Sequence, residues 1–121
     1  MRESIIKNKS FEFSLQIIDL YKILQSKKEF VLSKQLLRSA TSIGSNVNEA
    51  LAGESKADFL HKMAIASKEA RETLYWLELL EKSQIITYQY NVHINNCSEI
   101  VKILTNIVRT TKQNLKLKTK N

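Results

Sequence analysis

Proline is missing from this chain, and glycine occurs only twice, at Gly44 and Gly53. The tight turns that join β-strands depend on these two residue types, so their scarcity disfavours a sheet-rich fold. Of the 121 residues, 43% are apolar and 26% are charged, which is typical of a soluble folded domain and too apolar for a disordered chain. We therefore expect long helices in a single domain spanning residues 1–121.

Cysteine is scarce as well, since Cys97 is the only one. A single cysteine excludes an internal disulfide and a zinc site built from several cysteines, and it favours a reducing, cytoplasmic location. No apolar run approaches the ~20 residues that cross a bilayer, and residues 1–10 lack the apolar stretch of a secretory signal. We expect Cys97 to fill a small apolar space on a helix, and we expect no membrane association.

Acidic residues are missing from the last part of the chain. The formal net charge is +7, yet residues 11–101 carry ten basic and eleven acidic side chains. Residues 102–121 carry six basic side chains and no acidic one. The positive potential therefore belongs to the ends of the chain, and chiefly to the C-terminal end.

Apolar residues recur every three or four positions in four segments, about 10–27, 33–52, 56–83 and 91–116, as in amphipathic helices. Short connections between them favour antiparallel neighbours, so the predicted fold is an all-α, antiparallel up-and-down four-helix bundle. The predicted core stripes are Phe13, Ile17, Leu20 and Leu24; Leu36, Ala40, Ile43, Val47 and Ala50; Phe59, Met63, Ala66, Ala70, Thr73, Leu77 and Leu80; and Cys97, Val101, Leu104, Val108 and Leu115.

Two helix ends carry local signals. Gly53 is predicted to end the second helix in the left-handed conformation, which glycine adopts at little steric cost. Ser55 is predicted to cap the third helix, with the carboxylate of Asp58 three positions later at the positive helix end.

A stripe of small polar side chains runs along the second helix, beside its apolar stripe. Such side chains permit close approach of helices, and Arg38 is placed to pair with Glu69 or Glu72. One interpretation is an interface between copies of the chain, which also includes Trp76; the other is a solvated helix face. The stripe consists of Gln35, Ser39, Ser42, Asn46 and Glu49.

A stripe of cations runs along the fourth helix and continues into the tail. Cations on one helix face suit a phosphate backbone, because each neutralised phosphate releases counterions. The alternative is that they serve solubility and complement the helix dipole. The candidate nucleic-acid-binding residues are Lys102, Arg109, Lys112, Lys116, Lys118 and Lys120.

Catalytic motifs are also missing. The chain has no glycine-rich phosphate loop, no paired cysteines and no supported Ser/His/Asp pattern. A di-metal bundle needs Glu-x-x-His on two helices, and Asp58, His61, Glu69 and Glu72 match this pattern poorly, so metal-dependent catalysis ranks last. We expect no enzymatic activity, cofactor, metal or small-molecule substrate.

Three segments resemble a known family: Phe11-Glu12-Phe13, residues 32–50 (LSKQLLRSATSIGSNVNEA) and residues 55–80 (SKADFLHKMAIASKEARETLYWLELL). They resemble the four-helix-bundle proteins named for 23S rRNA intervening sequences, across nearly the whole chain. The resemblance implies a bundle that assembles into a ring-like homopentamer. A related branch, the accessory proteins of diversity-generating retroelements, uses a basic surface to engage nucleic acid and a reverse transcriptase. This chain departs from the common pattern at Gly44-Ser45, where a proline often follows the Ser-Ile pair, and at Asn48.

Two functions remain open at this point. The first is a self-assembling module that associates with RNA or with a nucleoprotein through the C-terminal cations. The second is a homo-oligomeric scaffold that binds a protein partner, with the basic ends serving solubility.

Overall fold

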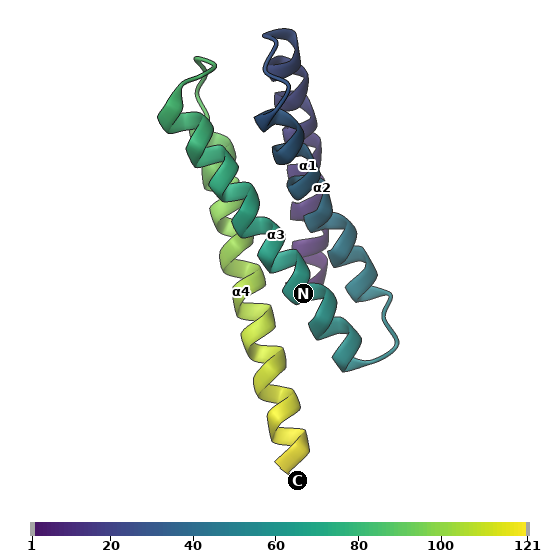
Figure 1. Ribbon diagram of the computed structural model, residues 1–121. Helices are drawn as coiled ribbons and strands as arrows, with labels where there is room; N and C mark the ends of the chain where they lie inside the picture. The colour runs from purple at the N-terminus through teal and green to yellow at the C-terminus, as the bar shows by residue number, and fades with distance from the viewer. Residues whose placement is uncertain (1, 121) are drawn as a thin grey trace.

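The protein consists of four α-helices and contains no strand within residues 2–120 (Figure 1). This computed structural model describes the backbone of residues 2–120 and the side chains of residues 5–117. The helices are α1 (Arg2–Ser26), α2 (Leu32–Leu51), α3 (Lys56–Ser83) and α4 (Asn91–Lys120). The predicted all-α, four-helix fold is thus confirmed.

Each helix packs against two others. The pairs in contact are α1 with α2, α2 with α3, α3 with α4, and α1 with α4. Successive helices run in opposite directions, and in the view of Figure 1 the last turns of α4 extend past the α2–α3 connection. Within the part of the chain that the structure describes, no helix combines the length and apolar character needed to cross a bilayer.

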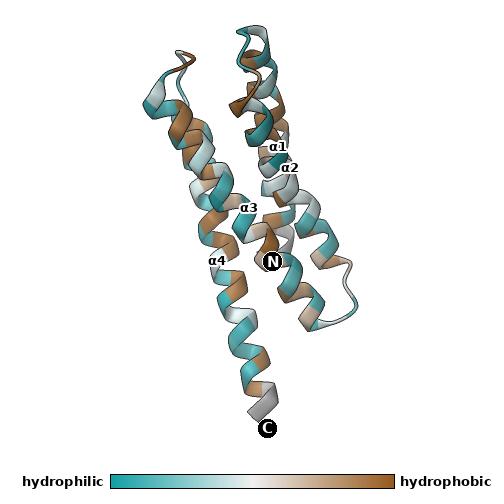
Figure 2. Ribbon diagram, viewed as in Figure 1, coloured by the Kyte–Doolittle hydropathy of each residue, from teal (hydrophilic) through white to brown (hydrophobic). Residues whose placement is uncertain are grey.

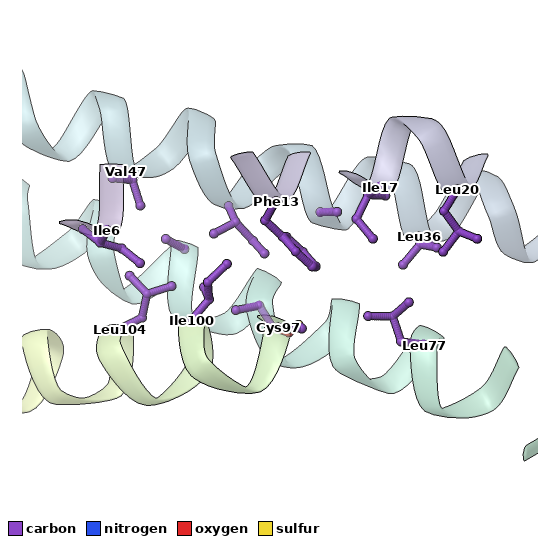
Figure 3. Packing of buried hydrophobic residues seen from close by; sticks show 14 of the residues in the cluster. Ile6, Phe13, Ile17, Leu20, Leu36, Val47, Leu77, Cys97, Ile100 and Leu104 are labelled. Atoms are coloured by element: carbon purple, nitrogen blue, oxygen red, sulfur yellow. The ribbon is translucent and has the colours of Figure 1, made fainter. Parts of the chain in front are cut away.

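The core lies where the apolar stripes of the four helices meet. Phe13 of α1 points into its centre, and Leu36 of α2 faces Leu77 of α3 (Figure 3). The predicted stripes of α1 and α2 are buried throughout, as is that of α3 apart from the half-buried Phe59. On α4, Cys97 and Leu104 of the predicted stripe are buried, together with Ile100, Ile107 and Thr111, whereas Val101, Val108 and Leu115 are half-buried.

Helix α1 begins eight residues before the predicted start at residue 10. Ile6 is fully buried and adds a turn to the core, with Ser10 between it and Phe13. The polar Ser10 interrupts the apolar stripe in the sequence, and this interruption hid the extra turns. Its hydroxyl donates a hydrogen bond to the Lys7 carbonyl oxygen at 3.1 Å, so the buried polar group keeps a partner.

Glu29 caps the N-terminus of α2 from the preceding connection. The residue is only 7% exposed, and its carboxylate accepts hydrogen bonds from the backbone N–H groups of Val31 at 3.2 Å, Leu32 at 3.1 Å and Ser33 at 2.6 Å. The Ser33 hydroxyl donates to the Glu29 carbonyl oxygen at 2.7 Å. A negative charge at this position satisfies the unpaired N–H groups of the first turn and complements the helix dipole.

The predicted left-handed stop at Gly53 is wrong. No glycine has a positive φ among the residues described, and α2 ends at Leu51 with Ala52 at φ −88°. The Gly53 N–H donates to the Ala50 carbonyl oxygen at 3.2 Å, which closes the helix with a right-handed turn. A Cβ at Gly53 would lie 3.2 Å from that oxygen, so glycine is used here for a close approach rather than for its left-handed conformation.

The other local signals have mixed outcomes. Ser55 caps α3 as predicted, because its hydroxyl oxygen accepts the Asp58 N–H at 3.0 Å. Left-handed residues do follow two helices, but they are Lys28 after α1 and Gln84 after α3. In the α3–α4 connection, the Tyr90 hydroxyl donates to the Ile86 carbonyl oxygen at 2.9 Å.

Candidate nucleic-acid interface

The cations of α4 lie on one exposed face of the helix. Lys102, Arg109, Lys112 and Lys116 are all solvent-exposed, and their spacing of seven, three and four residues returns each side chain to the same side. Lys118 and Lys120 follow within the last turns of α4, but their side chains lie outside the described residues.

Helices α3 and α4 enclose a groove of about 560 Å³ along this face. Three of the four described cations of the α4 stripe line it, while Lys102 lies outside, and α3 contributes a further cation, Arg71. The remaining lining is polar at Ser67, Thr105 and Gln113 and apolar at Leu60, Val108 and Leu115. We call this feature the α3–α4 groove. Figure 2 shows the last turns of α4, which carry its cations, as mostly hydrophilic, with isolated apolar positions.

Hydrogen bonds to α4 hold both arginines of the groove. Arg71 Nη2 donates to Thr105 Oγ1 at 3.4 Å, which ties the α3 side chain to the opposite wall. Arg109 Nη2 donates to Asn106 Oδ1 at 2.6 Å. Within the residues described, neither these arginines nor Lys112 and Lys116 form an ion pair with an acidic side chain. The groove therefore presents positive charge that no acidic side chain among residues 5–117 pairs with.

The polar stripe of α2 lies against α3 in the same chain. Arg38 pairs with Glu69 at 3.6 Å and with Glu72, and both carboxylates come from α3. Ser39 is fully buried, and its hydroxyl oxygen accepts a hydrogen bond from Thr73 Oγ1 at 2.9 Å. We call these contacts the α2–α3 seam.

The remaining residues of the stripe lie around this seam. Glu49 pairs with Lys62 at 3.2 Å, and Trp76 Nε1 donates to Glu72 Oε2 at 3.4 Å. The side chains of Ser42 and Asn46 donate to carbonyl oxygens of their own helix, at 2.7 and 2.8 Å, while Gln35 is exposed. The structure thus brings most of the predicted interface residues together within one chain, and their role between copies stays a prediction.

The residues weighed as metal ligands are not gathered into a site. No group of three His, Cys, Asp or Glu side chains within the described part of the chain lies close enough to hold a metal. Glu69 and Glu72 face Arg38 rather than His61.

Two buried titratable groups lie away from the groove. Burial raises the pKa of the Cys97 thiol to about 12, with a smaller contribution from the nearby Glu78 carboxylate. Its sulfur lies 3.4 Å from the Ala70 carbonyl oxygen and is fully shielded from solvent, so Cys97 is an unreactive core residue. Burial also lowers the pKa of His93, near the start of α4.

Sequence reasoning missed the part of the groove that α3 supplies. Arg71, Leu60 and Ser67 are not among the candidate nucleic-acid-binding residues predicted from the sequence. The available signal was the spacing of Leu60, Ser67 and Arg71 by seven and four residues, which places them on one face of α3. Nothing in the sequence indicated that this face borders the cations of α4.

Comparison with known proteins finds a similar fold and a similar sequence. Residues 2–106 match the family model for the 23S rRNA-intervening sequence protein, while Arg109, Lys112 and Lys116 follow the matched region. A search of curated proteins found no relative. A crystal structure of a protein of unknown function from the S23 ribosomal protein family, from Bacteroides thetaiotaomicron VPI-5482, is 50% identical, with a TM-score of 0.85 over 90% of this chain and 99% of that one. With a match over most of its length, the chain belongs to the 23S rRNA-intervening sequence protein family.

Proposed function

We propose that this protein is a non-catalytic, self-assembling bundle that associates with RNA, alone or in a nucleoprotein, in the cytoplasm. The observation that carries the proposal is the α3–α4 groove, where four cations from two helices converge without an acidic partner in the described part of the chain.

The charge distribution supports a phosphate ligand over a general solubility role. Lysines that only keep a helix end soluble have no reason to converge with an arginine of another helix. In the groove, Arg71 of α3 stands opposite α4, where Arg109 and Lys112 line the other wall. Converging cations neutralise neighbouring phosphates together, and this releases several counterions from one binding event.

Exposed apolar side chains support self-assembly. Phe30 and Val31 in the α1–α2 connection are 47% and 72% exposed, and Ile85 in the α3–α4 connection is 59% exposed. Figure 2 shows apolar residues in both connections, at the same end of the bundle. On α1, Phe11 is 60% and Leu15 45% exposed. Large apolar side chains grouped on a surface mark contact sites. The proposed assembly, a ring-like homopentamer, is the one that the family resemblance implies.

The same exposed side chains favour a second candidate, a homo-oligomeric scaffold that binds another protein without nucleic acid. Aromatic residues are enriched in protein interfaces, and Phe11 and Tyr75 are both more than half exposed on the outside of the bundle. In this candidate the groove cations contact acidic side chains of the partner.

Native mass measurement of the protein purified from its own cells, with and without ribonuclease, separates these candidates. The first candidate predicts an oligomer that carries RNA and loses that mass after ribonuclease. The second predicts an oligomer, with or without a protein partner, whose mass ribonuclease leaves unchanged. A monomer without either partner would contradict both.

A further inference from the structure

We propose that the α3–α4 groove selects single-stranded over double-stranded RNA by taking an unpaired base onto its apolar side chains, an inference that rests on the proposed association with RNA. The volume of about 560 Å³ falls within the roughly 300–1,000 Å³ typical of small-ligand sites. It is far more space than a phosphate group alone requires.

The groove is layered in its chemistry. Leu60, Val108 and Leu115 are half-buried and form what we call its floor, whereas Arg71, Arg109, Lys112 and Lys116 are exposed and form its rim. A ligand that fits both layers carries negative charge beside a flat apolar face. A nucleotide with an exposed base has this combination.

A duplex cannot use the floor. Its bases are stacked and paired inside the helix, so a protein surface meets phosphates and sugars, and only the rim cations contribute. In a single strand the bases can be splayed out, and a protein gains from stacking and apolar contact in addition to charge. The floor therefore adds affinity for single strands only.

The two arginines supply the stacking surface that aromatic rings provide in many RNA-binding proteins. Guanidinium planes stack on bases, and a guanidinium already held by a hydrogen bond loses less freedom on binding. Thr105 holds Arg71 and Asn106 holds Arg109, and both of these acceptors belong to α4. Ser67 and Gln113 add hydroxyl and amide groups that can hydrogen-bond a base edge.

The test compares the binding of one labelled RNA strand of about 12 nucleotides, a length within the range of known single-strand sites, with that of the same strand annealed to its complement. Fluorescence anisotropy of the full-length protein at about 0.1 M salt gives both affinities. We expect the single strand to bind roughly tenfold more tightly than the duplex, which is the gain that stacking of one base provides. Equal affinities for the two RNAs overturn the inference and leave the proposed function standing, whereas binding of neither RNA overturns both.

Variants of the floor make the test specific. Val108→Thr keeps the side-chain shape, and Leu60→Ser removes apolar surface; we expect each to weaken single-strand binding about threefold or more and to leave duplex binding unchanged. Leu79→Ser, on α3 but outside the groove lining, is the matched control and should change neither. Circular dichroism checks that each variant is folded. If single-strand affinity survives in the folded Val108→Thr and Leu60→Ser variants, or if polyglutamate displaces the strand as well as unlabelled RNA does, the groove responds to charge alone and the inference fails.

Discussion

Helix α3 presents two faces that use the same kinds of residue in opposite ways. On the α2 side, every cation in contact has an acidic partner: Arg38 pairs with Glu69 and Glu72, and Lys62 pairs with Glu49. On the α4 side, Arg71 meets a helix whose last 20 residues carry no acidic side chain at all. Charge is neutralised within the α2–α3 seam and remains available in the α3–α4 groove.

The two faces of α3 therefore contribute to different properties, the α2 face to the stability of the fold and the α4 face to ligand binding. Charges that are paired across a helix contact contribute to the folded state, whereas uncompensated cations slightly oppose it through mutual repulsion and gain only when a ligand arrives. Substitutions on the two faces should therefore have different consequences.

The largest effect is expected from the groove. The fourfold variant R71Q/R109Q/K112Q/K116Q, which neutralises the four cations that line the groove, should weaken RNA binding about 100-fold and reduce the slope of log affinity against log salt by up to ~3. Anisotropy titrations at several salt concentrations measure both quantities. The variant K22Q/K27Q/K28Q/K34Q removes the same charge from exposed positions outside the groove and should retain most of the affinity. Equal losses in the two variants would show that net charge, and not the groove, governs binding.

The buried hydroxyl pair of the seam should have the next largest effect. Thr73→Val removes the donor to Ser39 Oγ in a fully buried site, and we expect it to lower the free energy of unfolding by about 1–2 kcal/mol. Denaturant titration measures this change. Thr105→Val, on the half-buried wall of the groove, is the matched control and should cost less than ~0.5 kcal/mol. Similar losses from both would contradict the distinction between the two faces.

The two arginines give a smaller and more direct comparison. Arg38→Gln removes the partner of two α3 carboxylates, of which Glu69 is only 18% exposed, and should destabilise the fold by about 1 kcal/mol. Arg71→Gln removes a single 3.4 Å hydrogen bond and should stay within ~0.5 kcal/mol of the unchanged protein while weakening RNA binding. If Arg71→Gln destabilised the fold more than Arg38→Gln, the roles assigned to the two faces of α3 would be contradicted.

The smallest effect concerns the other end of α4, where a chargeable group is buried instead of exposed. The Nδ1 atom of His93 is buried and has no hydrogen-bond partner among the described residues, and burial lowers the pKa of His93 below its ordinary 6.5. As the pH falls below that value, the unfolded chain takes up the proton before the folded protein does, so the stability should decline. In thermal melts between about pH 7 and pH 5, His93→Gln should lessen this decline. Parallel curves for His93→Gln and the unchanged protein would contradict this assignment.

The fold was largely predictable, because the apolar spacing of each helix fixes which face is buried. At the two places where the predicted helix ends differ from the structure, a single residue departs from the usual sequence pattern. Ser10 occupies a core position that its own helix satisfies, so α1 was predicted too short. Gly53 was given a left-handed role, yet that conformation falls at Lys28 and Gln84, which have no such preference.

The candidate site was only half predictable. A helical repeat shows which cations of α4 share a face, and that much followed from the sequence. The contribution of Arg71, Leu60 and Ser67 depends on how α3 is rotated against α4, which tertiary packing decides. The carboxylate of Glu29 was missed for a related reason: it reaches forward from a connection to cap α2, outside the residue types that usually mark a helix start.

The burial of Cys97 allows transient separation of the helices to be measured through the reaction of its thiol. The thiol is the only one in the chain, it is fully shielded, and its pKa of about 12 keeps it protonated at neutral pH. A thiol reagent can therefore modify the protein only when the helices around Ala70 and Cys97 separate. The rate of modification therefore depends on how often these helices separate. A bound ligand or neighbouring subunits that hold α3 and α4 together should slow the modification.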